Sequence, residues 1–271
     1  MSDMEPEEVA RRVAGGDRRA CARLITRIEQ RDPSALAIRD LLPVRGAFKI
    51  GITGPPGAGK STLVDLIVHH ARAEGVTVGV LAVDPSSPRT GGALLGDRIR
   101  MQGHATDPGV FIRSMGTRGH YGGLAAATSD AARVLDAFGC SVILLETVGV
   151  GQTEVEVVDL ADVTILVLGP NAGDGIQAMK AGIMEVPDLF VVNKADLPGA
   201  DAAVLEIRRL LAEDVDLPMT PGVSPVAGPA DRVFATRALD DPARNGVPEL
   251  WRAIRERQLA LAAPAQLEEV P

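Results

Sequence analysis

The stretch GPPGAGKS, residues 54–61, decides the fold of this chain of 271 residues. It matches the pattern G-x-x-x-x-G-K-[ST] and lies between a short apolar run and a helix-forming stretch, STLVDLIVHHARAEG at 61–75. In such a unit the glycines let backbone N–H groups point at phosphates, and the helix N-terminus adds a favourable dipole. We therefore predict a P-loop in which Lys60 contacts the β- and γ-phosphates and the Ser61 hydroxyl binds Mg²⁺.

The rest of the loop is expected to surround the same phosphates. A chance match in a glycine-rich loop is the alternative, and the apolar run before the loop and the helical stretch after it argue against that alternative. The expected nucleotide-binding residues of the loop are Gly54, Pro55, Pro56, Gly57, Ala58, Gly59, Lys60, Ser61 and Thr62.

Short apolar runs recur along the chain on both sides of this loop. Several are apolar at every position, as in a sheet covered by helices on both faces. The segments between them are long enough for crossover helices, so the pattern predicts an α/β P-loop fold with a mostly parallel sheet. The expected strands cover residues 48–53, 77–84, 110–114, 141–146, 163–168, 189–193 and 232–236.

Three parts of the chain differ in pattern. Residues 1–45 are expected to form an N-terminal helical extension. Within it, residues 6–40 are predicted to form a pair of helices, with Asp17 as an N-cap. Residues 46–257 are expected to form the nucleotide-binding domain, with a surface loop at the proline- and glycine-rich stretch 218–229. Residues 258–271 are expected to be a short disordered tail.

The sequence NKAD, residues 193–196, is expected to read the base. It follows the apolar run LFVV, so it lies at the carboxyl end of a strand, where open α/β sheets bind ligands. The Asp196 carboxylate can accept hydrogen bonds from guanine N1–H and the 2-amino group, whereas adenine offers neither donor in that arrangement. Asn193, Lys194 and Asp196 therefore favour GTP over ATP.

A second base-side element follows the run RVFA. Arg237, Ala238 and Leu239 occupy a position that resembles the Ser-Ala-Leu loop of G proteins, with arginine where serine is usual.

Three acidic residues are candidates for holding Mg²⁺ together with Ser61. Asp84 ends the second expected strand, Asp97 lies in the segment beyond it, and Glu146 ends SVILLE and begins a switch-like ETVG. A carboxylate that follows a buried strand and faces the phosphate loop is well placed for a direct or water-mediated contact to the metal. We expect Lys60, Asp97 and Glu146 to be catalytic; helix capping or solvation is the alternative for Asp84 and Asp97.

Composition excludes several functional classes. Lys and Arg sum to 28 and Asp and Glu to 36, which gives a net charge of −8 and argues against a general nucleic-acid binder. Cys21 and Cys140 are far apart, so a disulfide scaffold or a CxxC metal site is not expected. The acidic N-terminus lacks an apolar core and no run of about 18 apolar residues exists, so we expect a cytoplasmic protein without a signal peptide or membrane contact.

The ordered set of motifs resembles one family, the methylmalonyl-CoA mutase-associated GTPases of the MeaB/ArgK type. The resemblance covers roughly residues 10–257. The motifs that carry it are GPPGAGKST, AVDPSSPRTGGALLGDRIRM, FIRSMGTRGHYGG, ETVGVGQTE, GPNAGDGIQAMKAGIMEVPDLFVVNKAD and GVPELW.

The resemblance implies a SIMIBI-class G domain that binds GTP, GDP and Mg²⁺. It also implies a chaperone that uses GTP to gate adenosylcobalamin loading and to protect or reactivate an acyl-CoA mutase. By position, Lys60 and Ser61 match the P-loop contacts, and Asp84, Asp97 and Glu146 match the acids around Mg²⁺. Residues 169–180 match a switch loop that signals to the mutase.

Other points stay open at this level. Members of the family commonly continue beyond the LWRAI helix into a longer helical arm used for dimerisation. Only about fifteen residues follow that helix here, so we do not expect homodimerisation in the usual manner. Methylmalonyl-, isobutyryl-, ethylmalonyl- and 2-hydroxyisobutyryl-CoA mutases are all possible clients. Arg113, Arg118 and His120 can face phosphate or a partner, or belong to a solvated loop, and Gln152 is a candidate for orienting the attacking water.

Two other functions share this scaffold. A small-molecule kinase is one alternative, but such enzymes usually take ATP and need no guanine clamp. A nickel-delivery GTPase is the other, and the four scattered histidines and two distant cysteines argue against it.

Overall fold

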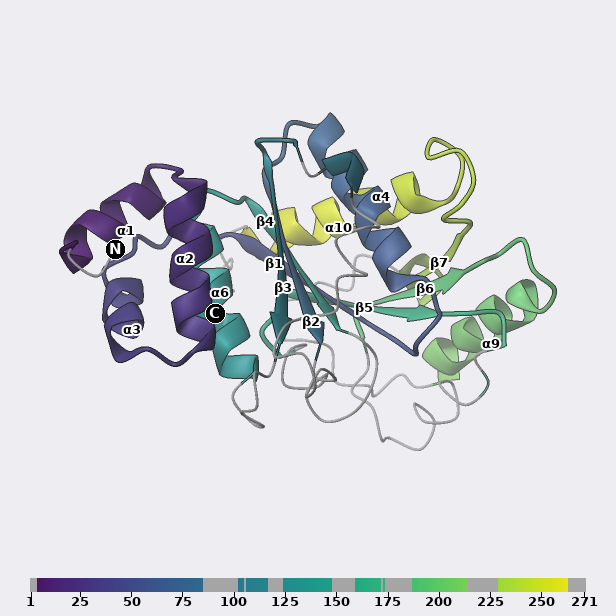
Figure 1. Ribbon diagram of the computed structural model, residues 1–271. Coiled ribbons are helices and arrows are strands. Elements are labelled where there is room, and N and C mark those ends of the chain that lie inside the picture. The colour runs from purple at the N-terminus through teal and green to yellow at the C-terminus, as the bar shows by residue number, and fades with distance from the viewer. Residues whose placement is uncertain are drawn as a thin grey trace, which may run out of the picture. The chain divides into compact units, whose positions relative to one another are not determined.

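The computed structural model describes most of the chain and divides it into two compact units, residues 1–167 and 168–271 (Figure 1). The larger unit contains the P-loop and the smaller contains the NKAD sequence. The described residues are 4–84, 102–104, 106–116, 124–147, 159–171, 173, 187–213 and 229–262.

The larger unit is built on five strands in the order β3-β2-β4-β1-β5. Neighbouring strands in this order run parallel to each other, which confirms the predicted parallel α/β fold. The β1–β4 pairing brings Ile52 beside Glu146, two residues that are far apart in the sequence. The strands are β1 (Phe48–Thr53), β2 (Val78–Asp84), β3 (Val110–Gly116), β4 (Val142–Thr147) and β5 (Val163–Leu168).

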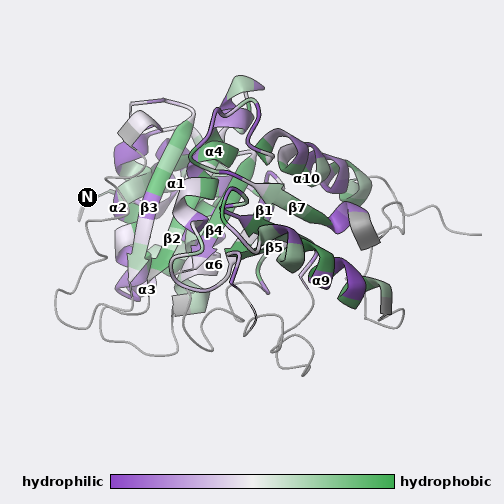
Figure 2. Ribbon diagram, turned by 90° about the vertical axis from the view of Figure 1, so that its right-hand side faces the viewer, coloured by the Kyte–Doolittle hydropathy of each residue, from purple (hydrophilic) through white to green (hydrophobic). Residues whose placement is uncertain are grey.

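Different helices cover the two faces of these strands. One face packs on α6 (Leu124–Phe138) and on the N-terminal helices, and Leu81, Val83 and Met115 lie in that hydrophobic cluster. Helix α4 (Lys60–Ala73) also contacts β1, β2 and β4, but none of its residues belongs to the cluster, so α4 lies on the other face. Figure 2 shows these strands as largely hydrophobic, whereas the helices also carry hydrophilic residues.

The N-terminal extension contains three helices, so the predicted helical pair is wrong in number. Helices α1 (Pro6–Ala14), α2 (Arg18–Glu29) and α3 (Pro33–Asp40) follow one another closely. Asp17 is the N-cap of α2, as expected, and its side chain accepts from the N–H groups of Arg19 and Ala20. Asp32 caps α3 in the same way, and Pro33 lies in the first turn of that helix, a position that proline favours.

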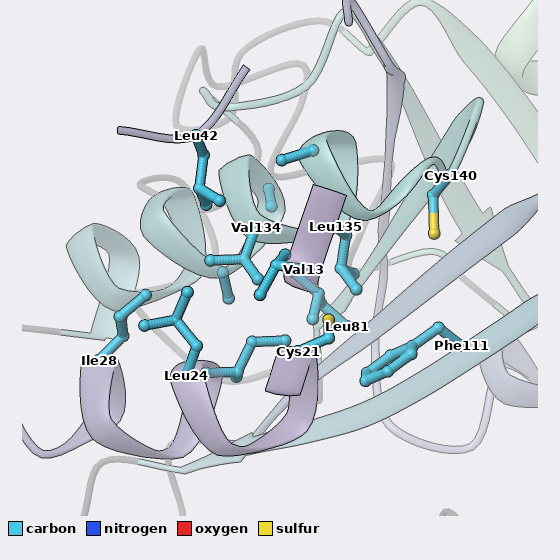
Figure 3. Close-up of a cluster of buried hydrophobic side chains, with 14 of the residues drawn as sticks. Val13, Cys21, Leu24, Ile28, Leu42, Leu81, Phe111, Val134, Leu135 and Cys140 are labelled. Carbon is cyan, nitrogen blue, oxygen red and sulfur yellow. The ribbon is translucent and has the colours of Figure 1, made fainter. Parts of the chain in front are cut away.

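The core of the larger unit joins these helices to the sheet. Figure 3 shows Val13, Leu24 and Ile28 packed with Val134 and Leu135 of α6. Cys21 and Cys140 are buried in the same cluster as free thiols. The extension therefore shares one hydrophobic core with the strands and α6 of the larger unit rather than forming a separate one.

The smaller unit pairs β6 (Leu189–Asn193) with β7 (Val233–Thr236) in parallel. Its helices are α9 (Ala200–Glu213), the short η2 (Pro229–Arg232) and α10 (Val247–Ala262). Leu250 and Trp251 of α10 are buried in the core of this unit.

Two further findings concern the helices. Helix α10 includes residues 258–262, the first part of the expected tail, because QLALA has high helix propensity. Among the residues that the structure describes, no helix is long and apolar enough to cross a membrane.

Candidate nucleotide site

The P-loop depends on glycines at the positions where its backbone turns. Gly54, Gly57 and Gly59 have φ angles of +134°, +77° and +96°, a region that side chains with a Cβ rarely adopt. A Cβ on Gly54 would lie 2.0 Å from the carbonyl oxygen of Val167 at the end of β5. Gly59 is the N-cap residue of α4, so the loop passes directly into that helix. The sequence pattern therefore produces a tight loop at a helix N-terminus, the geometry that suits phosphate.

Lys60 lies inside this loop rather than in solvent. Its Nζ donates to the carbonyl oxygens of Gly54, at 2.6 Å, and Pro55, at 3.2 Å. The side chain is buried although it is cationic, and carbonyl dipoles stabilise its charge. The ammonium group is thus held in the loop, where a phosphate could replace the carbonyls as its partner.

Ser61 and Glu146 come together from distant parts of the sequence. The Ser61 hydroxyl at the start of α4 donates to Glu146 Oε1 at 2.5 Å, and Glu146 is only 5% exposed. Hydroxyl and carboxylate oxygens are hard donors of the kind that Mg²⁺ prefers, and Mg²⁺ usually needs only one or two of them because it keeps several waters. The two residues therefore fit a magnesium site, and the structure brings both predicted partners together.

The other two predicted metal residues are less well described. Asp84 is the last residue of β2, and its side chain is not described; Asp97 lies outside the described residues. Within the described part, no group of three or more His, Cys, Asp or Glu side chains could hold a metal ion. The roles of Asp84 and Asp97 stay predictions.

Asn193 connects the two predicted base loops of the smaller unit. It is the buried last residue of β6, and its Oδ1 accepts from Thr236 Oγ1 at 3.0 Å and from the Ala238 N–H at 3.3 Å. The Ala195 N–H donates to the Thr236 carbonyl oxygen at 2.9 Å. Asn193 thus holds the loops together, and Thr236, which the site prediction did not include, is its partner.

Lys194 and Asp196 project from this framework. Both side chains are exposed, and Lys194 has a φ of +59°, a conformation that is uncommon outside glycine and often marks a functional site. The Leu197 N–H donates to the Lys194 carbonyl oxygen at 3.0 Å, which closes the turn. The Asp196 carboxylate therefore lies exposed on a hydrogen-bonded turn that follows a buried strand.

The second base loop shows why arginine is tolerated where serine is usual. The Arg237 N–H donates to the Asn245 carbonyl oxygen at 2.8 Å, so its backbone supports the loop, while its side chain is exposed and lines an open cavity of about 830 Å³. Ala238 is buried and Leu239 is 93% exposed.

Two residues that support this loop were missed by sequence reasoning. Gly246 has a φ of +82°, and a Cβ there would lie 2.2 Å from the Ala235 carbonyl oxygen. Asn245 accepts from the Val247 N–H at the start of α10 through its side chain. The Asn-Gly dipeptide before a helix was the available signal.

Arg113 does not face a phosphate or a solvated loop. It lies on β3 and forms an ion pair with Glu29 of α2; the two side chains are 13% and 1% exposed. Its guanidinium also donates to Thr26 Oγ1 at 3.1 Å. Arg118, His120 and Gln152 lie outside the described residues, as does most of the predicted switch loop at 169–180.

Comparison with known proteins gives consistent matches over nearly the whole chain. A family model described as methylmalonyl Co-A mutase-associated GTPase MeaB matches residues 21–270. A Pyrococcus abyssi protein named as a putative GTPase is 52% identical over 265 residues, which cover 97% of this chain and 79% of the relative. GTPase ArgK of Escherichia coli is 37% identical, with the same two coverages of 97% and 79%.

A solved structure is also similar over nearly the whole chain. The crystal structure of a protein named LAO/AO transport system kinase matches with a TM-score of 0.72 and 29% identity, covering 96% of this chain and 77% of that one. The similarity is therefore not confined to the P-loop, which many unrelated proteins share.

Proposed function

Because the chain belongs to the family of methylmalonyl-CoA mutase-associated GTPases, we propose that this GTPase is a chaperone for a B12-dependent acyl-CoA mutase. In this proposal, GTP binding and hydrolysis gate the loading of adenosylcobalamin and protect or reactivate the mutase. The observation that carries the proposal is the family match over residues 21–270, since the family description links a GTPase to that mutase.

In this proposal, different residues bind the phosphates, the base and the metal ion of GTP. The P-loop and Lys60 would hold the phosphates, and the exposed Asp196 carboxylate would accept hydrogen bonds from guanine, with Arg237, Ala238 and Leu239 as the second base-side element. Ser61 and Glu146 would hold Mg²⁺, with Asp84 and Asp97 as further acids. The metal, when bound, neutralises charge on the phosphate oxygens.

Hydrolysis then depends on electrostatic stabilisation of the developing charge. Lys60 and the backbone N–H groups of the loop are fixed before reaction, so they stabilise that charge without reorganising. Arg113 is held by Glu29 and is not available as an arginine finger. We therefore expect slow intrinsic turnover that a partner stimulates, by up to roughly 10³- to 10⁵-fold when it supplies a missing group.

The test combines the purified chain with each candidate mutase in its cofactor-free and cofactor-loaded forms. We expect one mutase to raise the rate of GTP hydrolysis, and a non-hydrolysable GTP analogue to change the transfer of adenosylcobalamin into it. If GTP is hydrolysed but no mutase alters the rate or receives cofactor differently, the chaperone role is wrong and the GTPase activity remains.

A kinase is the second candidate, favoured by the name of the protein in the similar solved structure. GTP labelled at the γ-phosphate distinguishes the two functions. A GTPase releases the label as inorganic phosphate, whereas a kinase transfers it to an added small-molecule acceptor. The Asn193–Asp196 turn favours the first outcome, because kinases of this type usually take ATP.

A further inference from the structure

Four strands of the larger unit present one residue each at the same level of the sheet. The parallel register pairs Ile52 with Glu146, Glu146 with Ala82, and Ala82 with Ser114. In register, such residues point to the same face of the sheet. Ser114, Ala82 and Glu146 therefore form one row across β3, β2 and β4.

The row faces the P-loop side. The residues that come directly before and after this row on the strands point to the opposite face: Leu81 and Val83 on β2 and Met115 on β3 belong to the cluster that packs on α6 and the N-terminal helices. Because successive residues of a strand alternate between faces, the row points the other way. The hydrogen bond from Ser61 at the start of α4 to Glu146 agrees with this placement.

The Ser114 hydroxyl is buried on this face and has no hydrogen-bond partner among the residues that the structure describes. Ser114 is 9% exposed, and its Oγ is one of the buried polar atoms for which the structure has no partner among the described residues. Buried hydroxyls are normally hydrogen-bonded, and an unmade bond costs free energy. A buried serine in this state therefore calls for an explanation, and a bound ligand is one of the recognised explanations.

The distance to Glu146 indicates what kind of ligand would fit. Two strand spacings separate the backbones of Ser114 and Glu146, about 10 Å, and Ala82 between them contributes only a methyl group. A serine and a glutamate side chain do not meet directly across that span. A cation that keeps its waters does bridge such a span, because water extends the reach of each polar group.

We propose that Ser114 is a positioning residue for the magnesium site, whose hydroxyl hydrogen-bonds a water of the hydrated Mg²⁺ held by Ser61 and Glu146. The proposal rests on the proposed GTPase function and adds a residue that acts through the water shell. Hydrogen-bond partners outside the ligand sphere orient the ligands, and their loss typically weakens metal affinity by about 10- to 100-fold.

The test measures how Mg²⁺ slows the release of a fluorescent GDP analogue from wild type and from Ser114→Ala. We expect the Mg²⁺ concentration for half-maximal retention to rise about tenfold in Ser114→Ala. Release in EDTA should stay unchanged, because the hydroxyl acts only through the metal. Ser114→Thr keeps the hydroxyl and should behave like wild type. Binding of Mn²⁺, measured by its electron paramagnetic resonance signal, should be weaker in Ser114→Ala than in wild type and in Ser114→Thr.

Ser141→Ala is the matched control, since Ser141 lies just before β4 at the opposite end of the strand and bonds Thr77 Oγ1 at 3.0 Å. A Mg²⁺ titration of Ser114→Ala that superimposes on wild type, with an unchanged or raised melting temperature, overturns the inference and leaves Ser114 as a packing residue. If wild-type release is the same with and without Mg²⁺, the magnesium site of the proposed function fails instead.

Discussion

Lys60 is the residue on which the proposed hydrolysis depends most directly. Its ammonium group is held inside the P-loop by two carbonyl oxygens, so it is already positioned before phosphate arrives. The charge is compact and close to the loop backbone, which suits the β- and γ-phosphates. Burying a charged side chain costs free energy unless the charge is paired or hydrogen-bonded, and these hydrogen bonds stabilise the Lys60 charge inside the loop.

We expect Lys60→Ala to weaken GTP binding and to lower the hydrolysis rate by at least about 10²- to 10³-fold, the usual effect of removing one donor from a preorganised site. Phosphate release by the purified variant is the measurement. Lys49→Ala is the control, because Lys49 lies on β1 and pairs with Asp162 instead. Turnover near the wild-type level in Lys60→Ala would contradict the assignment.

Asp196 is expected to determine base specificity. Its carboxylate accepts from guanine N1–H and the 2-amino group, whereas xanthine has a carbonyl in place of that amino group. Asn in this position offers one acceptor and one donor, so Asp196→Asn should shift the preference from GTP toward XTP. A site that pairs the polar groups of its ligand can reject a mismatched ligand by roughly 10⁴-fold, because polar groups that the bound ligand covers are left unpaired.

Competition among GTP, ATP and XTP measures the shift in both proteins. Wild type that binds ATP as tightly as GTP would remove the base assignment. Asp201→Asn, an exposed carboxylate in the first turn of α9, should leave the preference unchanged.

At the scale of elements, the P-loop is held by the strand beside it as well as by its own hydrogen bonds. Gly54 follows β1 directly, and the carbonyl oxygen of Val167 on β5 occupies the space where a side chain would begin. The backbone of Gly54 therefore lies close enough to β5 that no side chain fits between them. This contact is between two backbones, so no change of side-chain rotamer relieves it.

We expect Gly54→Ala to destabilise the fold by about 1–3 kcal/mol or more through backbone strain, and to abolish nucleotide binding by displacing the loop. Gly75→Ala is the matched control. Gly75 also has a positive φ, at +77°, but nothing lies within 4 Å of a Cβ added there. That variant should lose only about 1–2 kcal/mol and keep its affinity for GTP. Equal losses of affinity in the two variants would show that the Val167 contact is unimportant.

At the scale of the larger unit, the N-terminal helices are part of the fold rather than an appendage. Helix α2 contacts β3 at two points: Arg18 donates to the carbonyl oxygen of Val110, the first residue of the strand, at 2.8 Å, and Glu29 pairs with Arg113 in the middle of the strand. The ion pair is almost fully buried, so each charge depends on its partner for stabilisation.

We expect Glu29→Ala to lower the free energy of unfolding by about 3–5 kcal/mol, because it leaves the Arg113 charge buried. Glu8→Ala breaks a comparable pair with Arg11 at the surface, where the side chains are 41% and 74% exposed. That control should change stability by less than about 1 kcal/mol. Urea unfolding of both variants checks the difference, and similar midpoints would contradict the burial argument.

The two thiols report on the same core. Burial raises the pKa of Cys21, and it raises the pKa of Cys140 to about 12. Below that pH the thiols stay protonated in the folded state, and the reactive thiolate is absent. We expect neither cysteine to react with a disulfide reagent at pH 8 in the native protein, and both to react in guanidinium chloride. Rapid labelling of the native protein would show that the N-terminal helices open readily.

The sequence alone predicted the elements that local physics determines. The P-loop, the strands and the Asn193–Asp196 turn could be read directly, because backbone freedom at glycine, apolar runs of strand length and strand-end polar residues act over a few neighbouring positions. Asp17 was recognised as a helix start for the same reason. The family resemblance then supplied the GTPase assignment, since its motifs occur in a specific order.

The tertiary structure alone decided which distant residues meet. The contacts of Ser61 with Glu146, of Asn193 with Thr236 and of Arg113 with Glu29 each join segments 43 to 85 residues apart. Such contacts depend on strand order and register, and these follow from how the whole core packs rather than from any local pattern. Ser114 shows the consequence: nothing in its neighbours distinguishes it, and only the register of β3, β2 and β4 places its hydroxyl in the same row as Glu146.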